Sequence, residues 1–137
     1  MNYARYAHAR KYGYRSGLEK KLSDELKALK VKFSYESLKI EWEDLAYRTY
    51  TPDFILYNGV IIEAKGMFTA IDRRKHLCIK RQHPKLDIRF IFDNPNKKLY
   101  KRGRMTYAGW CDKHSFIYCK RSDGIPEEWL NERQRSL

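Results

Sequence analysis

The chain has 137 residues, of which 42% are hydrophobic and 34% are charged, and its 29 Lys and Arg against 17 Asp and Glu give a formal net charge of +12. A chain of this length and apolar content can bury a core as one domain, which argues against a disordered protein. The positive charge favours an anionic partner, nucleic acid ahead of an anionic membrane surface, and no apolar run is long enough to span a bilayer.

The first 15 residues interleave tyrosines with basic residues, and no helical or strand pattern holds there. We interpret residues 1–15 as a flexible arm whose cations neutralise phosphates while its tyrosines stack on unpaired bases. Its cations are Arg5, Arg10, Lys11 and Arg15. The alternative is a terminus that contacts nothing. The arm lacks the apolar core of a signal peptide, so a cytoplasmic protein is expected.

Residues 16–30 carry the clearest helical pattern. Leucines recur so that one face of the predicted helix is apolar and the rest is charged. Ser16 followed by Glu19 matches a capping box, in which each side chain accepts a hydrogen bond from the backbone N–H of the other residue. Glu19 therefore has a structural explanation that competes with any chemical role.

Two stretches of alternating apolar residues follow, 31–35 and 38–42, and their phase slips at Glu36-Ser37. The slip predicts one bent or bulged strand, or two short strands. Residues 43–50 have weak local preference and are interpreted as a polar connector. Pro52 then opens a strand, where its missing N–H does least harm.

The dipeptide Asn-Gly at 58–59 is a strong signal for a β-hairpin, and charged residues lie on both of its strands. Glu63 and Lys65 are two residues apart, so they share one face of the second strand. Asp53 lies on the first strand, and the turn decides whether its side chain joins them.

The register of this hairpin follows from the length of its loop. A two-residue loop would set Asp53 opposite Ala64, on the wrong face. A three-residue loop over 57–59, with Gly59 at positive φ, would set Asp53 opposite Glu63, and a bulge would have the same effect. We therefore predict an odd-register turn or a bulge, because only this register assembles a site.

Two carboxylates brought together repel, and a hard divalent cation such as Mg²⁺ relieves the repulsion because it prefers oxygen ligands. Asp53 and Glu63 would then hold an ion suited to phosphodiester hydrolysis, and Lys65 could orient the attacking water or stabilise developing charge. The alternative for Lys65 is a surface salt bridge to Glu63, worth under about 1 kcal/mol. The basic composition favours the nuclease interpretation.

The remaining pattern predicts alternating helices and strands. The expected elements are a helix over 68–84 that ends before Pro84, a near-continuous apolar strand over 86–92, a short helix over 106–114, a strand over 116–119 and a helix over 125–133. This order predicts an α/β fold in which one mixed central sheet is flanked by helices. We expect residues 16–137 to form the single domain.

Positive charge is dense on the predicted helix that follows the hairpin. Its cations are Arg73, Arg74, Lys75, Lys80 and Arg81. Beside a metal site they are candidates to contact DNA phosphates, although a solvated helix face is the usual explanation for a run of charges.

The residues resemble a known family. "PDF" followed after a hairpin by "EAK" is the short PD-(D/E)xK nuclease signature, and the stretches "YRSGLE", "FSYE", "TYTPDFIL", "DRRKHL", "QHPKLDIRFIF", "KLYK" and "IPEEW" extend the likeness over about Tyr14 to Trp129. In this order they resemble endonuclease I of T-odd bacteriophages, which resolves four-way DNA junctions. The location expected from this resemblance is the cytoplasm of the host cell.

The resemblance implies a restriction-endonuclease-like core and a fuller site. Asp53 and Glu63 would bind Mg²⁺, for which Mn²⁺ substitutes, together with the Ala64 carbonyl and Glu19, and Lys65 would serve the attacking water. It also implies a homodimer that exchanges its first helix and strand through a bridge, here residues 43–50, so that Glu19 serves the partner's site. The family's bridge contains proline, whereas no proline lies between Phe33 and Thr51 here.

The function expected is that of a metal-dependent, structure-selective DNA endonuclease that resolves four-way (Holliday) and other branched junctions in paired nicks. The alternatives are a restriction-like or repair nuclease on duplex DNA and a non-catalytic basic DNA-binding protein. Branched DNA and a second copy of the chain are the expected partners, and neither a membrane nor a nucleotide cofactor is expected.

Overall fold

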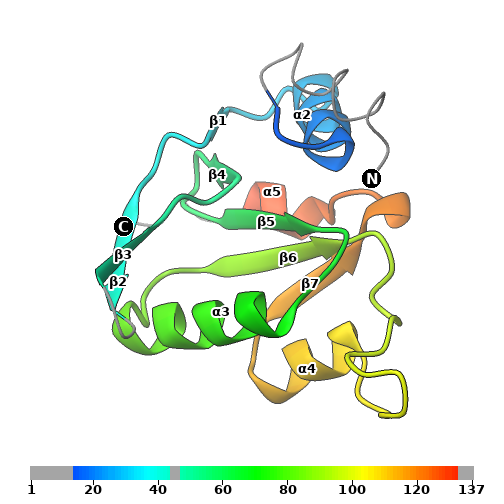
Figure 1. The fold of residues 1–137 in the computed structure, drawn as a ribbon. Coiled ribbons are helices and arrows are strands. Elements are labelled where there is room, and N and C mark those ends of the chain that lie inside the picture. Colours follow the sequence, from blue (N-terminus) through cyan, green and yellow to red (C-terminus); the bar gives the residue numbers. More distant parts are fainter. Residues whose placement is uncertain (1–13, 44–46, 133–137) are drawn as a thin grey trace.

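The computed structural model describes residues 14–43 and 47–132 (Figure 1). Most of the predicted arm, with Arg5, Arg10 and Lys11, lies outside the described residues. Among the described helices, none combines the length and the apolar character needed to cross a membrane.

The first described helix, α2 (Gly17–Ala28), confirms the predicted one, and Ser16 is its N-cap. Its apolar stripe is buried through Leu18, Leu22 and Leu26, because these residues follow the helical repeat. Leu29, which the pattern placed on the same stripe, is the C-cap and is 47% exposed.

The central sheet has five strands in the order β1-β4-β5-β6-β7. The strands are β1 (Phe33–Tyr35), β4 (Phe54–Leu56), β5 (Ile61–Lys65), β6 (Ile88–Phe92) and β7 (Ile117–Lys120). The pairs β1–β4 and β4–β5 are antiparallel, whereas β5–β6 and β6–β7 are parallel, so the sheet is mixed as predicted. Strand β6 is buried at every position, which explains its near-continuous apolar sequence, and its one charged residue, Arg89, is paired with Asp87 and Glu132.

A second, two-stranded sheet joins β2 (Ile40–Glu43) to β3 (Tyr47–Tyr50). Strands β1 and β2 confirm the expectation of two short strands, and Glu36, at the phase slip between them, has a φ of 49°. The expectation of a connector over 43–50 was wrong for the described part. Strand β3 pairs with β2, and its two tyrosines and Thr49 are residues that favour strands.

The other helices lie close to their predicted positions. They are α3 (Ala70–Gln82), α4 (Tyr107–Lys113), the 3₁₀ turn η1 (Arg121–Asp123) and α5 (Glu127–Asn131). Helix α3 begins with a complete capping box between Thr69 and Asp72, and Thr106 caps α4.

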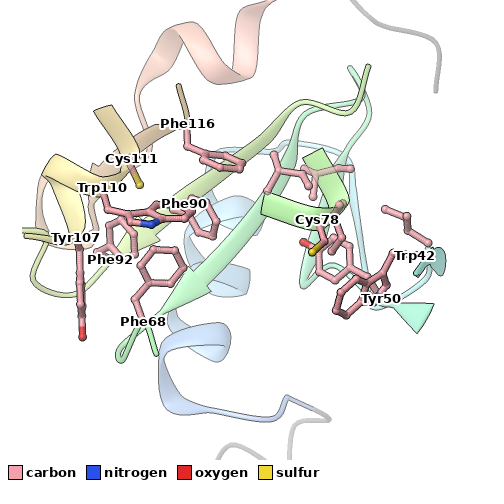
Figure 2. Close-up of a cluster of buried hydrophobic side chains, with 14 residues drawn as sticks. Trp42, Tyr50, Phe68, Cys78, Phe90, Phe92, Tyr107, Trp110, Cys111 and Phe116 are labelled. Atoms are coloured by element: carbon pink, nitrogen blue, oxygen red, sulfur yellow. The ribbon is translucent and has the colours of Figure 1, made fainter. Parts of the chain in front are cut away.

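The sheet separates two hydrophobic clusters. One face packs against α3, α4 and the β2–β3 sheet, and Figure 2 shows its aromatic side chains, with Phe68, Phe90 and Trp110 in mutual contact. The other face packs against α2 and α5, with Leu22 and Trp129 among the buried residues. Because α2 lies on one face and α3 on the other, their N-terminal ends flank the carboxyl end of β5 (Figure 1).

Candidate active site

The turn between β4 and β5 has the predicted odd register. The pairs Phe54–Ile62 and Ile55–Ile61, continued by one residue, put Asp53 opposite Glu63. The Leu56 N–H donates to the Val60 carbonyl at 2.8 Å, which closes a three-residue loop, and Gly59 has a φ of 89°. The prediction of a three-residue turn that brings the two acids together is confirmed.

Glu63 is 4% exposed and is held from three directions. The Tyr50 hydroxyl donates to Glu63 Oε2 at 2.7 Å, and the Asp53 backbone N–H donates to the same oxygen at 3.4 Å. Lys65 Nζ lies 3.4 Å from the other oxygen, Oε1. Burial and the charge of Glu63 raise the pKa of Tyr50 well above its ordinary value, so the phenol stays protonated and is the donor of this hydrogen bond.

Asp53 is 9% exposed, and the Ala64 N–H donates to its Oδ2 at 2.9 Å. Burial, followed by the negative charges of Glu63 and Glu19, raises the pKa of Asp53 well above its ordinary value. The hydrogen bond from Ala64 and the charge of Lys65 oppose this rise. The charge of Lys65 therefore only partly offsets the burial of Asp53 and its repulsion from the two glutamates.

Glu19 comes from α2 and joins the same site within one chain. Its carboxylate, that of Asp53 and that of Glu36 each offer an oxygen, and these oxygens lie within 4.8 Å of one another. The Tyr35 hydroxyl donates to Glu19 Oε2 at 2.7 Å. Arg15 Nη1 lies 3.5 Å from Glu36 Oε1.

The capping box predicted for Glu19 is half formed. Ser16 Oγ accepts a hydrogen bond from the Glu19 N–H at 3.1 Å, as expected. The carboxylate of Glu19 instead reaches Tyr35, because the first turn of α2 faces the end of β1 across the site. The side chain of Glu19 is thus available to the site while its backbone serves the cap.

A cleft of about 810 Å³ collects these groups. It is lined by Arg15, Ser16, Gly17, Leu18, Glu19, Thr51, Asp53, Glu63, Ala64, Lys65, Gly66, Met67, Asp72, Lys75 and Asp93. The acids lie beside cations, and Lys65 Nζ is also 3.4 Å from Asp72 Oδ1. Burial lowers the pKa of Lys65, but the charges of Glu63 and Asp72 outweigh it, so the net shift is upward. A cleft that carries both acids and basic side chains suits an anion that binds to a cation held by those acids.

The residues fit a divalent cation. Carboxylate oxygens are the ligands that Mg²⁺ and Mn²⁺ prefer, and Asp53, Glu19 and Glu36 converge at ligand-sharing distance. The pKa of Asp53 is raised first by burial and then by repulsion from Glu63 and Glu19, and a bound cation would relieve that repulsion. Of the predicted ligands, Glu63 lies on the strand beside Asp53, and Ala64 lines the cleft.

Some of the residues predicted to contact DNA line the cleft, and others are exposed elsewhere on α3. Arg15 and Lys75 line the cleft, and Lys75 Nζ lies 4.8 Å from the centre of the Tyr50 ring. Arg74 is exposed on α3, next to the β2–β3 sheet. Arg81 is exposed near the other end of α3.

Two residues predicted to contact DNA, Arg73 and Lys80, instead donate hydrogen bonds within the protein. Arg73 is only 7% exposed and donates to the Phe68 carbonyl at 2.7 Å and to the Tyr100 hydroxyl at 3.3 Å. Lys80 donates to the carbonyls of His114 and Ser115 at 2.7 and 2.8 Å. Their contact with DNA stays a prediction.

Sequence reasoning missed three residues of the site. Glu36 sits at the phase slip between two strands, and an acid at such an irregular position was a usable signal. Tyr35 and Tyr50 gave no signal, because an alternating apolar pattern cannot show that a tyrosine hydroxyl meets a carboxylate from another element.

Comparison with known proteins gives consistent matches over nearly the whole chain. A family model described as phage endonuclease I matches residues 1–137. Endonuclease I of Escherichia phage T7 is 42% identical over 130 residues, which cover 93% of this chain and 86% of that protein. Endodeoxyribonuclease 1 of Enterobacteria phage T3 is 44% identical over 125 residues, which cover 90% of this chain and 81% of that protein.

Proposed function

The chain belongs to the phage endonuclease I family and is a deoxyribonuclease, and from this premise we propose that it cuts branched DNA, four-way junctions above all, with the aid of Mg²⁺. The observation that carries the proposal is the convergence of the carboxylates of Glu19, Glu36 and Asp53 at a cleft that Glu19, Asp53, Glu63 and Lys65 line. A net charge of +12 supports a polyanionic substrate.

Mg²⁺, or Mn²⁺ in its place, would be held by Asp53 and Glu63, with Glu19 and the Ala64 carbonyl, and Glu36 joins this set from the structure. When bound, the ion supplies charge neutralisation on the phosphodiester and activation of water. The acids repel one another without it, which makes occupancy favourable.

The chain's own residues supply positioning and charge. Lys65 is held between Glu63 and Asp72, so its ammonium group faces the cleft at a fixed place and can orient the attacking water or stabilise charge on the phosphate. Lys75 and Arg15 lie on the same cleft and would hold the flanking phosphates.

We further propose that the working form is a homodimer, since paired nicks across a four-way junction need two sites. In the described chain Glu19 approaches Asp53 of its own chain. The same contacts would form between subunits if α2 and β1 changed places with their copies, because they join the rest of the chain through β2 and β3. The bridge over residues 43–50, of which 44–46 lie outside the described residues, would carry this exchange.

The test adds Mg²⁺ to a labelled four-way junction and to a linear duplex of the same sequence. Nicking confined to the junction supports the proposal, and equal cutting of the duplex would replace it with a restriction-like or repair nuclease. Glu63→Gln and Lys65→Ala should abolish cutting and keep junction affinity near that of the wild type. Loss of affinity together with activity would mean that these residues maintain the fold rather than the chemistry.

A further inference from the structure

Residues 94–106 connect β6 to α4 and form a hairpin, called the basic hairpin from here on, that carries no acidic residue. All of its cations are exposed: Lys97, Lys98, Lys101, Arg102 and Arg104. None of them makes an ion pair with another of the described residues. Like charges this close repel one another, so the hairpin keeps a positive potential that nothing on the described protein surface cancels.

The basic hairpin is ordered by its own backbone. Lys98 pairs with Thr106 in an antiparallel bridge, and the Leu99 N–H donates to the Met105 carbonyl at 2.9 Å. The Gly103 N–H closes the turn on the Tyr100 carbonyl at 3.1 Å. A solvated run of charges needs none of this order, whereas a surface that must meet a partner gains from it, because less conformational freedom is lost on binding.

Contacts of Leu99 and Tyr100 hold the hairpin against the fold. Leu99 packs against the aromatic cluster of Figure 2. The guanidinium group of Arg73 on α3 lies 5.5 Å from the centre of the Tyr100 ring and donates to its hydroxyl. Arg73 thus acts as an anchor for the hairpin, which explains why a predicted phosphate contact is buried.

The hairpin begins beside the cleft. It follows Asp93, which lines the cleft, and Figure 1 shows the segment leaving the end of β6 and folding next to α4. Lys75, two residues after its anchor Arg73, lines the cleft. None of the hairpin's five cations lines the cleft, so they offer a surface separate from it.

From these observations, and resting on the proposed function, we propose that the basic hairpin is a second DNA-binding surface that grips the backbone of a substrate arm away from the cleavage site. Exposed Lys and Arg side chains contact mainly DNA phosphates, which carry no sequence information, so the contact adds affinity without sequence preference. Its position makes it available to the arm that leaves the cleft past β6.

The test compares two triple variants that lose the same charge. Lys101→Gln/Arg102→Gln/Arg104→Gln neutralises the tip of the hairpin. Lys27→Gln/Lys30→Gln/Lys32→Gln removes three exposed lysines in the last turn of α2 and just after it, none of which lines the cleft; Lys30 and Lys32 lie next to Tyr57 and Asn58 of the 57–59 turn. Binding to a four-way junction and to a linear duplex is measured in EDTA, so the result does not depend on cutting.

We expect the slope of log affinity against log salt between about 50 and 200 mM to fall by up to about 2.7 for the hairpin variant, and affinity at the lower salt to fall at least about tenfold. Hydroxyl-radical footprinting should lose one backbone patch outside the cut site. The control should keep its slope and footprint. Equal slopes and footprints for the two variants would overturn the inference. If the hairpin variant binds both DNAs more weakly but the wild type shows no preference for the junction, the inference about the hairpin holds and the proposed junction selectivity fails.

Discussion

Two glutamates of the cleft each accept a hydrogen bond from a tyrosine hydroxyl of a different element: Glu19 on α2 from Tyr35 on β1, and Glu63 on β5 from Tyr50 on β3. A phenol that donates a hydrogen bond to one carboxylate oxygen leaves the second oxygen available to a cation. In Glu63 the other oxygen is Oε1, which lies 3.4 Å from Lys65 Nζ. Such outer contacts commonly change metal affinity or activity by about 10- to 100-fold when they are removed.

Tyr50→Phe should therefore weaken Mn²⁺ binding about tenfold, because Glu63 loses the donor that orients it. The phenylalanine ring keeps the packing of Tyr50 against His76 and beneath Lys75, so the fold should persist. Calorimetric titration with Mn²⁺ measures the affinity, and Tyr57→Phe, at a tyrosine 66% exposed in the turn, is the control. Equal Mn²⁺ affinity in both variants and the wild type would show that Tyr50 only fills space.

His76 offers a second prediction at the scale of one residue. Its ring is fully buried, packs edge-on against Tyr50 and Phe90, and has no hydrogen-bond partner for either nitrogen among the described residues. Burial, followed by the charges of Lys65 and Lys75, lowers the pKa of His76 well below its ordinary value.

Because the folded-state pKa is the lower one, the unfolded chain takes up the proton first as the pH falls. The contribution of His76 to stability is therefore present above about pH 6.5 and is lost below it, by up to about 1.4 kcal/mol per pH unit. Urea unfolding between about pH 5 and pH 8 should show this loss in the wild type relative to His76→Phe. Parallel stability curves for the two proteins would contradict a buried neutral imidazole.

At the scale of elements, the turn of residues 57–59 decides whether a site exists. One residue fewer would move Asp53 to the opposite face of β4. Gly59 makes the longer loop possible because its φ of 89° lies where a side chain is strained.

Gly59→Ala should lower the free energy of unfolding by about 1–2 kcal/mol, the cost of a non-glycine residue in the left-handed region. Urea denaturation provides the measurement. Gly103→Ala is the matched control, because a Cβ there meets the Tyr100 Cβ at an ordinary 3.4 Å. A loss no greater in Gly59→Ala than in the control would mean that the turn tolerates side chains and does not specify the register.

Local pattern predicted most of the elements, since apolar periodicity, N-caps and the Asn-Gly turn act over a few residues. It even predicted the register that joins Asp53 to Glu63, because the two possible loops place Asp53 on opposite faces. It missed the pairing of β3 with β2, and it did not predict that Arg73 is buried and donates to the Tyr100 hydroxyl. These features depend on contacts between distant elements, which local preference does not encode.

At the scale of the whole molecule, Glu19 either completes the site of its own chain or, in an exchanged dimer, the site of the partner subunit. Two inactive variants distinguish these arrangements, Glu19→Gln and Lys65→Ala. In an exchanged dimer made from one copy of each, one site keeps both Glu19 and Lys65, and nicking of one strand should return. The mixture is refolded together and assayed on a labelled four-way junction. If refolding yields mixed dimers and cutting stays absent, each site is built within one chain.

The central claim is that the acids of the cleft hold a divalent cation, and calorimetric titration of Mn²⁺ into the wild type and Asp53→Asn tests it most directly. The account predicts that the wild type binds Mn²⁺ and that Asp53→Asn binds it at least about tenfold more weakly at an unchanged melting temperature, because asparagine keeps the shape but not the charge. A wild type that does not bind Mn²⁺, or a variant with the same affinity, would contradict it.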